Sequence, residues 1–229
     1  MGSTNDEAKR LACEGAAEGT LVWAREQQAG RGRRGRRWAS PPGNLYLSLI
    51  LRPVEPAGRA AQLGFAAALA VGDLLADCAE IGFKWPNDVL LAGRKVAGIL
   101  LESEMGSGDA LAFLVVGVGV NLAAAPDGTE FPATSVAAAT GSAPDPGIAL
   151  ETFAHAFATW CQRWRRDGFG PLRTSWRARA TGIGGPIRVR LDNVTLAGRF
   201  ADIDEEGALL LESEDGRRRI AAGEIFPAA

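Results

Sequence analysis

The chain has 229 residues, of which 47% are hydrophobic and 23% are charged, and its formal net charge is −2 at pH 7. These values are ordinary for a folded globular protein, so they exclude a disordered or fibrous chain and argue against general binding to nucleic acid. Three cysteines without pairing or ligand spacing, no basic-then-apolar leader and no apolar run long enough to span a bilayer predict a cytoplasmic protein without membrane contact.

The first half of the chain predicts short elements around a loop that is rich in arginine. Oxygen-bearing side chains over residues 3–5, followed by apolar residues at helical spacing, predict a helix from about Asn5. β-Branched, aromatic and alternating apolar residues predict strands over 20–26 and 44–51. Alanines and leucines then keep a helical period without proline, which predicts one long helix over 57–80.

The second half predicts a hairpin, a buried strand, a helix and a small barrel. Apolar runs over 88–91 and 95–102 flank Ala92-Gly93-Arg94, a spacing typical of a β-hairpin with glycine at the turn. A further apolar run over 111–122 predicts a strand, and an apolar stripe over 147–166 predicts a helix. Short alternating runs separated by turn residues then predict an all-β barrel, with strands over 187–191, 196–203, 208–212 and 218–220.

The segment from Gly30 to Trp38, here called the arginine loop, holds five arginines and one tryptophan between two predicted strands. A solvated charge run is the usual explanation of such a block, and a nucleic-acid arm would need wider basic support. Residues 30–35 also match the dinucleotide pattern G-x-G-x-x-G, but that pattern requires a helix at its third glycine, whereas prolines and a strand follow here. The remaining hypothesis is a glycine-hinged loop that folds over a small anion, because guanidinium groups match carboxylate and phosphate oxygens.

Three later segments carry further polar residues of interest. Residues 84–88 (Lys-Trp-Pro-Asn-Asp) place a cation and a carboxylate around a proline, which alone is weakly informative. Lys95 opens a predicted strand and supplies a point charge for phosphate, and Gly98 in that strand lets a ligand approach the backbone. At the end of the next strand, Asn121 follows two glycines and adds one amide to a wall for a nucleotide.

Taken together and in this order, these segments resemble the biotin–protein ligases, and the similarity covers most of the chain. The segments that carry the resemblance are residues 3–5, 27–38, 84–88, 94–100 and 117–122. The resemblance implies an α/β (α+β) fold, with a mixed β-sheet and helices like the class II synthetase-like catalytic domain of biotin/lipoate ligases. That domain is expected over residues 1–182, and an SH3-like β-barrel is expected over 183–229.

The family joins biotin to ATP, releases pyrophosphate and passes the biotinyl group from biotinyl-5′-adenylate to one lysine of a biotin carboxyl carrier domain. The resemblance therefore implies biotin, ATP and Mg²⁺ as ligands and the carrier protein as partner. Homodimers are common in the family, and the sequence leaves the oligomeric state open. Cations fixed in the site lower the barrier by electrostatic stabilisation, since both reactants are anionic.

The resemblance also assigns roles to individual residues. The biotin-binding set is Ser3, Thr4, Asn5, Gln27, Gly30, Arg31, Lys95 and Gly98. The nucleotide-binding set is Arg33, Arg34, Arg36, Trp38 and Asn121, and the catalytic set is Arg33, Lys84, Asp88 and Lys95. Asp88 either holds magnesium or helps to deprotonate the incoming carrier lysine, and the sequence does not decide between these two roles.

The Ser-Thr-Asn motif begins at residue 3, whereas family members usually have a strand before it. This start leaves no room for the N-terminal helix-turn-helix domain of the repressor branch, so we expect a monofunctional ligase. Two rival functions share the fold. One is a lipoate ligase or octanoyl transferase, and the other is a ligand-binding protein that has lost the reaction.

Overall fold

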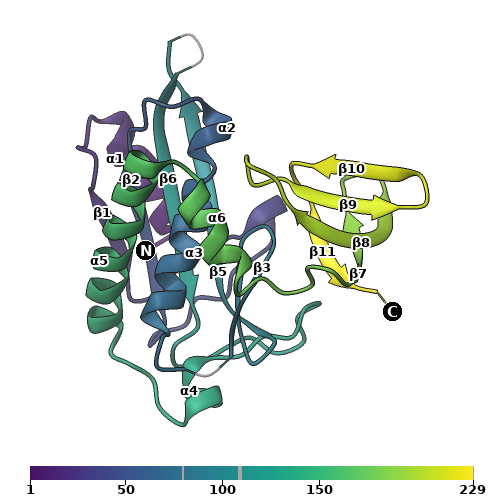
Figure 1. Ribbon diagram of the computed structural model, residues 1–229. Coiled ribbons are helices and arrows are strands. Elements are labelled where there is room, and N and C mark those ends of the chain that lie inside the picture. Colours follow the sequence, from purple (N-terminus) through teal and green to yellow (C-terminus); the bar gives the residue numbers. More distant parts are fainter. Residues whose placement is uncertain (79, 108–109, 229) are drawn as a thin grey trace.

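A six-stranded sheet forms the larger unit of the chain, and a five-stranded barrel lies beside it (Figure 1). The computed structural model describes residues 1–78, 80–107 and 110–228. In the larger sheet the strands follow the order β1-β2-β6-β5-β4-β3, and each described pair of neighbours is antiparallel. These strands are β1 (Leu21–Ala24), β2 (Leu45–Leu51), β3 (Ile81–Lys84), β4 (Asp88–Leu91), β5 (Arg94–Met105) and β6 (Leu111–Val120).

Three helices cover one face of this sheet (Figure 1): α3 (Leu63–Leu74), α5 (Pro146–Asp167) and α6 (Gly170–Arg177). Alternate residues of each strand point toward them, because successive side chains of a strand lie on opposite faces. Leu114, Val116 and Val118 of β6 are buried in this main core. Trp164 of α5 donates its indole N–H to Oε1 of Gln62 at 2.9 Å, which holds α5 against the start of α3.

The opposite face carries helix α1 (Thr4–Cys13), which packs on β1, β2 and β6 through a small second core that includes Ala8, Ala12, Ile50 and Val115. Next to α1, the same face of β5 and β6 carries three glycines beside Leu100. Gly98 of β5 pairs with Gly119 of β6, and Leu100 pairs with Gly117. Because glycine has no side chain, the sheet is bare there and other groups can lie directly on its backbone.

The smaller unit is an SH3-like barrel with the strand order β10-β9-β8-β7-β11. Its strands are β7 (Pro186–Arg190), β8 (Thr195–Ile203), β9 (Leu209–Ser213), β10 (Gly216–Ile220) and β11 (Glu224–Pro227). Trp85, in the turn between β3 and β4, donates its indole N–H to the backbone oxygen of Gly207 at 3.0 Å. Phe65 of α3 also lies against Gly207, where an added Cβ would stand 2.7 Å from the ring. The β8–β9 turn is therefore fixed to the larger unit.

The structure confirms the α+β class. Parallel strand pairing is rarer than the predicted mixed sheet implies. Parallel pairing is confined, in the described part of the chain, to two isolated bridges, Phe83 with Ala180 and Lys95 with Ala133. The predicted strands, the hairpin around Gly93 and the helix over 147–166 are found close to their expected bounds. Elements that were not predicted are β3, β11, a 3₁₀ turn over Arg33–Gly35, and the helices α4 (Val136–Thr140) and α6.

The predicted single helix over 57–80 is wrong in its continuity. A short helix α2 (Ala57–Ala60) precedes α3, and the N–H groups of Gln62, Gly64 and Phe65 bond three residues back, which tightens the chain there. The Gln62 side chain is held by Trp164 at this point, so tertiary packing overrides the local helical pattern. Helix α3 ends at Leu74, and Ala79 lies outside the described residues.

The segment before Ser3 forms no strand, yet it lies beside the start of the arginine loop. The backbone oxygens of Met1 and Gly2 accept hydrogen bonds from the N–H groups of Gln28 and Ala29, at 3.0 and 2.8 Å. These bonds hold the beginning of α1 next to Gln27, and thereby bring two of the predicted binding segments together.

Candidate active site

A cavity lies on the glycine-rich face of the larger sheet, between α1, the arginine loop and the barrel. The structure brings most of the predicted site residues to its wall: Ser3, Thr4, Asn5, Gln27, Arg31, Arg33, Arg36, Trp38, Lys84, Asp88, Lys95, Gly98 and Asn121. Two predicted residues are not in the wall. Gly30 is buried against Ser40 and Gln27, and the guanidinium of Arg34 turns to Asp192 of the barrel at 2.8 Å.

The floor of the cavity is built from the glycines of β5 and β6. A Cβ atom on Gly119 would stand 2.6 Å from Nε1 of Trp38, and one on Gly98 would stand 3.1 Å from the same ring. On Gly117, a Cβ would lie 2.2 Å from Oδ1 of Asn5. The glycines therefore make room for Trp38 at one end of the floor and for Asn5 at the other.

Hydrogen bonds among buried polar groups form the end of the cavity near α1. Oε1 of Gln27 accepts the backbone N–H of Thr4 at 2.8 Å and lies 3.1 Å from the hydroxyl oxygen of Thr4. Nε2 of Gln27 donates to Oγ of Ser40 at 3.1 Å. These bonds fix the first turn of α1 relative to Gln27, which lies three residues before the arginine loop. The polar, uncharged groups held in this way suit a polar, uncharged part of a ligand.

The arginine loop folds back on itself as an ordered element. Arg31 bridges to Arg37 in the antiparallel sense, and the N–H of Trp38 bonds to the oxygen of Gly30 at 2.9 Å. Between them, Arg33–Gly35 form one turn of 3₁₀ helix in which Arg34 has a positive φ of 57°. This compact fold directs neighbouring guanidinium groups in different directions.

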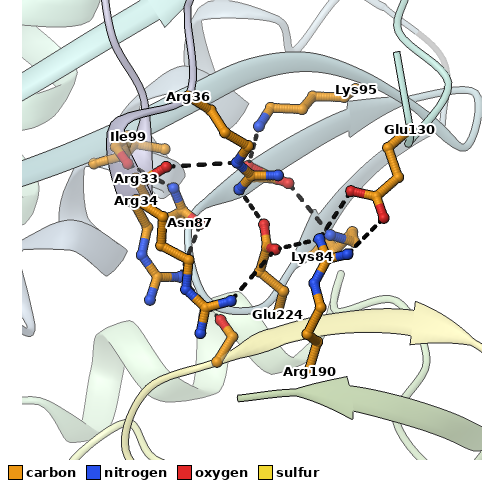
Figure 2. A network of polar contacts seen from close by, with 12 residues as sticks. Arg33, Arg34, Arg36, Lys84, Asn87, Lys95, Ile99, Glu130, Arg190 and Glu224 are labelled. Atoms are coloured by element: carbon orange, nitrogen blue, oxygen red, sulfur yellow. Dashed lines mark hydrogen bonds and ion pairs between the residues drawn. The ribbon is translucent and has the colours of Figure 1, made fainter. Parts of the chain in front are cut away.

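The charges of the loop divide into two groups. Arg31 pairs with Asp6 at 2.6 Å and with Glu102 at 3.1 Å, while Arg36 pairs with Glu224 of β11. Figure 2 shows that Glu224 also receives Arg190, which in turn pairs with Glu130 at 2.6 Å. These ion pairs join the loop, the barrel and the segment after β6.

Arg33 differs from these paired arginines, because no carboxylate among the described residues lies within ion-pairing distance of it. Its Nη1 donates to the backbone oxygen of Gly223 at 3.0 Å and approaches Oδ1 of Asn87 at 3.5 Å (Figure 2). Burial lowers the pKa of the Arg33 guanidinium from its ordinary value, a shift that the charge of Glu224 opposes. A desolvated cation that lines a cavity without a directly paired carboxylate is a site for an anionic ligand.

Two lysines share the carboxylate of Asp88. Nζ of Lys95 lies 2.5 Å from one oxygen of Asp88, and Nζ of Lys84 lies 3.3 Å from the other. Burial lowers the pKa of Lys84, Asp88 opposes that change and the charge of Lys95 adds to it. The rings of Phe131 and Phe226 cover Lys84, with Nζ 4.6 and 5.6 Å from their centroids. Two ammonium groups per carboxylate leave a net positive charge here.

Unpaired polar atoms mark the remaining part of the wall. Nε1 of Trp38 and Oδ1 of Asn121 are buried without a hydrogen-bond partner in the structure. The other amide atom of Asn121, Nδ2, donates to the oxygen of Thr134 at 3.1 Å, which fixes the side chain. A buried donor and a buried acceptor of this kind are most stable when a ligand completes their hydrogen bonds.

The charged and aromatic wall residues that lie outside the predicted segments are Glu130, Phe131, Glu224 and Phe226. Glu130 and Phe131 belong to a segment that lies beside the start of β5. The N–H of Lys95 bonds there to the oxygen of Pro132 at 2.8 Å. Glu224 and Phe226 belong to β11, which alternates too briefly to be recognised as a strand. No local pattern carries the information that these segments reach the cavity.

The described residues contain no cluster of three or more metal-ligating side chains. Nor, in the same residues, is any helix long and apolar enough to cross a bilayer.

Comparisons with known proteins agree on one family. Residues 2–121 match the model of the biotin/lipoate A/B protein ligase family, and residues 182–226 match that of the biotin protein ligase C terminal domain. A biotin--[acetyl-CoA-carboxylase] ligase of Paracoccus denitrificans is 48% identical over 98% of this chain and 96% of its own length.

Solved structures give the same result. The biotin protein ligase of Aquifex aeolicus in complex with biotin and ATP superposes with a TM-score of 0.83, at 29% identity, over 98% of this chain and 94% of that one. The biotin protein ligase of Leishmania major in complex with biotinyl-5-AMP superposes with a TM-score of 0.63, at 25% identity, over 99% and 95% of the two chains.

Proposed function

Because the chain belongs to the biotin/lipoate A/B protein ligase family, we propose that its cavity activates biotin with ATP and then passes the biotinyl group to a lysine of a carrier protein. The reaction is ATP-dependent biotinylation, in keeping with the names of the relatives and the ligands of the solved structures. In the first step the biotin carboxylate attacks the α-phosphate of ATP and pyrophosphate leaves. In the second step a lysine amine attacks the mixed anhydride and AMP leaves.

This proposal is carried by a group of three cations, Arg33, Lys84 and Lys95, that line one cavity. The two lysines share one carboxylate, that of Asp88, which lies between them. The first step brings a carboxylate against a polyphosphate, so fixed positive charge stabilises the transition state more than the separated reactants. Lys95 supplies charge to the reacting carboxylate and phosphate, and Arg33 holds the α-phosphate of the product. The side chains need only bind and orient, and no covalent enzyme intermediate is required.

We assign the two ends of the cavity to the two substrates. Thr4 and Gln27 at the α1 end present uncharged polar groups, which suit the cyclic urea of biotin. Trp38 and Asn121 at the opposite end have unpaired polar atoms, and an aromatic ring beside a bare strand suits adenine. Ser3, Arg31 and Gly98 complete the biotin wall, and Arg36 lies nearer the nucleotide.

The position of Arg34 supports a different role from direct nucleotide binding. Its ion pair with Asp192, which belongs to the barrel, ties the tip of the arginine loop to that domain. Asn5 is likewise engaged by other side chains at both ends of its amide. We therefore propose that Arg34 and Asn5 support the wall, while their neighbours contact the substrates.

Asp88 fits poorly as a magnesium ligand, because both of its oxygens face ammonium groups that would repel a second cation. We propose that it orients Lys84 and Lys95 toward the reacting groups. Magnesium stays a prediction for the ATP phosphates alone, and no step here is assigned to it.

The carrier domain as acceptor, the homodimer and the cytoplasmic location remain predictions. All three cysteines are free in the structure, as a reducing compartment would leave them. The domain boundary at residue 182 also remains our proposal, and the chain there passes from α6 and its following turn into β7.

The decisive experiment is incubation of the protein with ATP, magnesium and labelled biotin, with lipoate and octanoate as competitors. We expect pyrophosphate release, a labelled adenylate and, after addition of a carrier domain, labelled protein. A preference for lipoate or octanoate would assign the chain to the related ligases and transferases. Binding of biotin without release of pyrophosphate would show a protein that has lost the reaction.

A further inference from the structure

A chain of hydrogen bonds runs behind the α1 end of the cavity, from Glu102 on β5 to Thr4. Oε2 of Glu102 accepts from Nδ2 of Asn5 at 2.6 Å, and Oδ1 of Asn5 accepts from the hydroxyl of Ser48 at 2.5 Å. The hydroxyl oxygens of Ser48 and Thr4 are hydrogen-bonded at 2.8 Å. Ser48 is fully buried on β2, and Thr4 lines the cavity.

Glu102 determines which atom of Asn5 donates and which accepts in this chain of hydrogen bonds. An ionised carboxylate only accepts hydrogen bonds, so the NH₂ group of Asn5 must face it and the amide oxygen of Asn5 must face Ser48. Lys9 and Arg31 also donate to Glu102, both at 3.1 Å, and keep it charged. Burial alone would raise the pKa of this carboxyl, but the bonds from Asn5, Lys9 and Arg31 bring it below its ordinary value.

The orientation of the Asn5 amide determines which groups donate in the hydrogen bonds that lead to Thr4. The Ser48 hydroxyl has one proton, and the amide oxygen of Asn5 requires it as a donor. The oxygens of Ser48 and Thr4 lie 2.8 Å apart, a separation that needs a proton between them. That proton then comes from Thr4. The other acceptor within reach of the Thr4 hydroxyl, Oε1 of Gln27, is farther away at 3.1 Å and also receives the backbone N–H of Thr4. A proton given to either oxygen is not available to a ligand.

We propose that Ser48 and Glu102 are positioning residues that make the Thr4 hydroxyl an acceptor toward the cavity, so that it selects a ligand N–H. The inference rests on the proposed function, in which that N–H belongs to the cyclic urea of biotin. With its own proton committed to the network, Thr4 offers only lone pairs to the substrate. Neither residue touches the ligand: Glu102 acts through Asn5 and Ser48, and Ser48 acts directly on Thr4.

This arrangement has a consequence for specificity. An analogue of biotin in which a ureido N–H is replaced by a ring oxygen, a cyclic carbamate, has the same shape but presents lone pairs to Thr4. The parent protein should disfavour one of the two such carbamates by about 10-fold or more, because a hydrogen bond is lost and two acceptors meet.

The test measures KM and kcat for biotin and for ATP by pyrophosphate release, and the inhibition constants of the two carbamates, in Ser48→Ala and Glu102→Gln. In S48A the Thr4 hydroxyl loses its partner at 2.8 Å and keeps only the longer approach to Gln27 at 3.1 Å, so it can turn and donate to the ligand. We expect its KM for biotin to rise about 3- to 10-fold, with the KM for ATP unchanged and the preference for biotin over the carbamate reduced. E102Q should change in the same direction, because Asn5 can then reverse its amide.

Glu104→Gln is the matched control, since Glu104 lies on the same strand two residues away and contacts Cys13 outside this network. It should behave as the parent does. If S48A and E102Q remain folded by thermal melting and keep the parent's full preference for the urea, the inference is wrong. It is also wrong if both KM values rise together, which would indicate general damage. A parent protein that releases no pyrophosphate with biotin would instead refute the proposed function.

Discussion

Within the arginine loop, residues of one type differ in function because they differ in partners. Arg31 and Arg36 already have carboxylates, so a phosphate would have to compete with these for their guanidinium groups. Arg33 is desolvated and has backbone and amide oxygens as its hydrogen-bond partners. An incoming anion is therefore bound most favourably at Arg33. The cation there is already desolvated in the folded protein, so the anion does not have to displace a paired carboxylate or the full hydration of the guanidinium.

Replacing Arg33 by alanine should increase the rate at which the adenylate dissociates by about 10- to 100-fold, since one charge-assisted hydrogen bond is lost. The rate can be measured by trapping labelled biotinyl-adenylate on the protein and following its release. Arg37→Ala is the control, because Arg37 is an exposed arginine of the same loop that also lines the cavity. Equal release rates from the two variants would mean that the loop acts by its total charge.

Sequence patterns identified charged residues that line the cavity, but they did not identify the partners of those residues. The loop itself stands out because five arginines in nine residues need an explanation. Glu224 does not stand out, since it lies 188 residues from Arg36 and in an ordinary short strand. Such pairings depend on how the barrel docks, and no local pattern encodes docking.

At the scale of elements, two glycine-bearing strands act as the floor on which both halves of the site rest. The glycine-rich face of β5 and β6 continues directly from the small core under α1. Asn5 lies on Gly117, and Trp38 lies on Gly98 and Gly119. The same two strands thus determine how closely the polar end and the aromatic end approach the sheet.

Single methyl groups on this floor should affect the binding of the two substrates separately. Gly119→Ala would place Cβ 2.6 Å from the Trp38 ring nitrogen, so we expect a higher KM for ATP with little change for biotin. Gly117→Ala would place Cβ 2.2 Å from Oδ1 of Asn5, so the KM for biotin should rise instead. Steady-state kinetics with each substrate varied in turn measures both. The assignment of the two ends fails if the effects are exchanged.

The elements themselves were largely predictable, because hydrophobic periodicity decides most of them. The hairpin of β4 and β5 and the helix α5 follow their patterns closely. The division of the helix over 57–80 was not predictable, since it depends on the contact of Gln62 with Trp164, 102 residues away. Strand β11 was missed because only four residues carry it.

For the whole molecule, the barrel is part of the cavity. Figure 2 shows Glu224 of the barrel between Arg36 of the loop and Arg190, which reaches on to Glu130. Burial alone would raise the pKa of Glu224, but Arg190 and Arg36 bring it below its ordinary value, so it stays charged. The barrel therefore holds one end of the arginine loop while Asp6 and Glu102 hold the other.

Glu224→Gln should loosen that end of the loop, raising the KM for ATP and the rate of adenylate release about 3- to 10-fold while the KM for biotin stays the same. Glu212→Gln is the control, because Glu212 is a barrel carboxylate that pairs with Arg199 and Arg217 away from the cavity. Combining E224Q with Arg36→Gln should add little to either single change, since the two residues act together. Fully additive effects, or an equal response in E212Q, would contradict this role.

The order in which the walls of the cavity are synthesised follows from the position of β11. Glu224 and Phe226 leave the ribosome after every other residue of the cavity wall. A nascent chain that has already made the arginine loop and both lysines still lacks the carboxylate that holds Arg36 and one of the rings that cover Lys84. The cavity wall is therefore complete only after β11 has been synthesised.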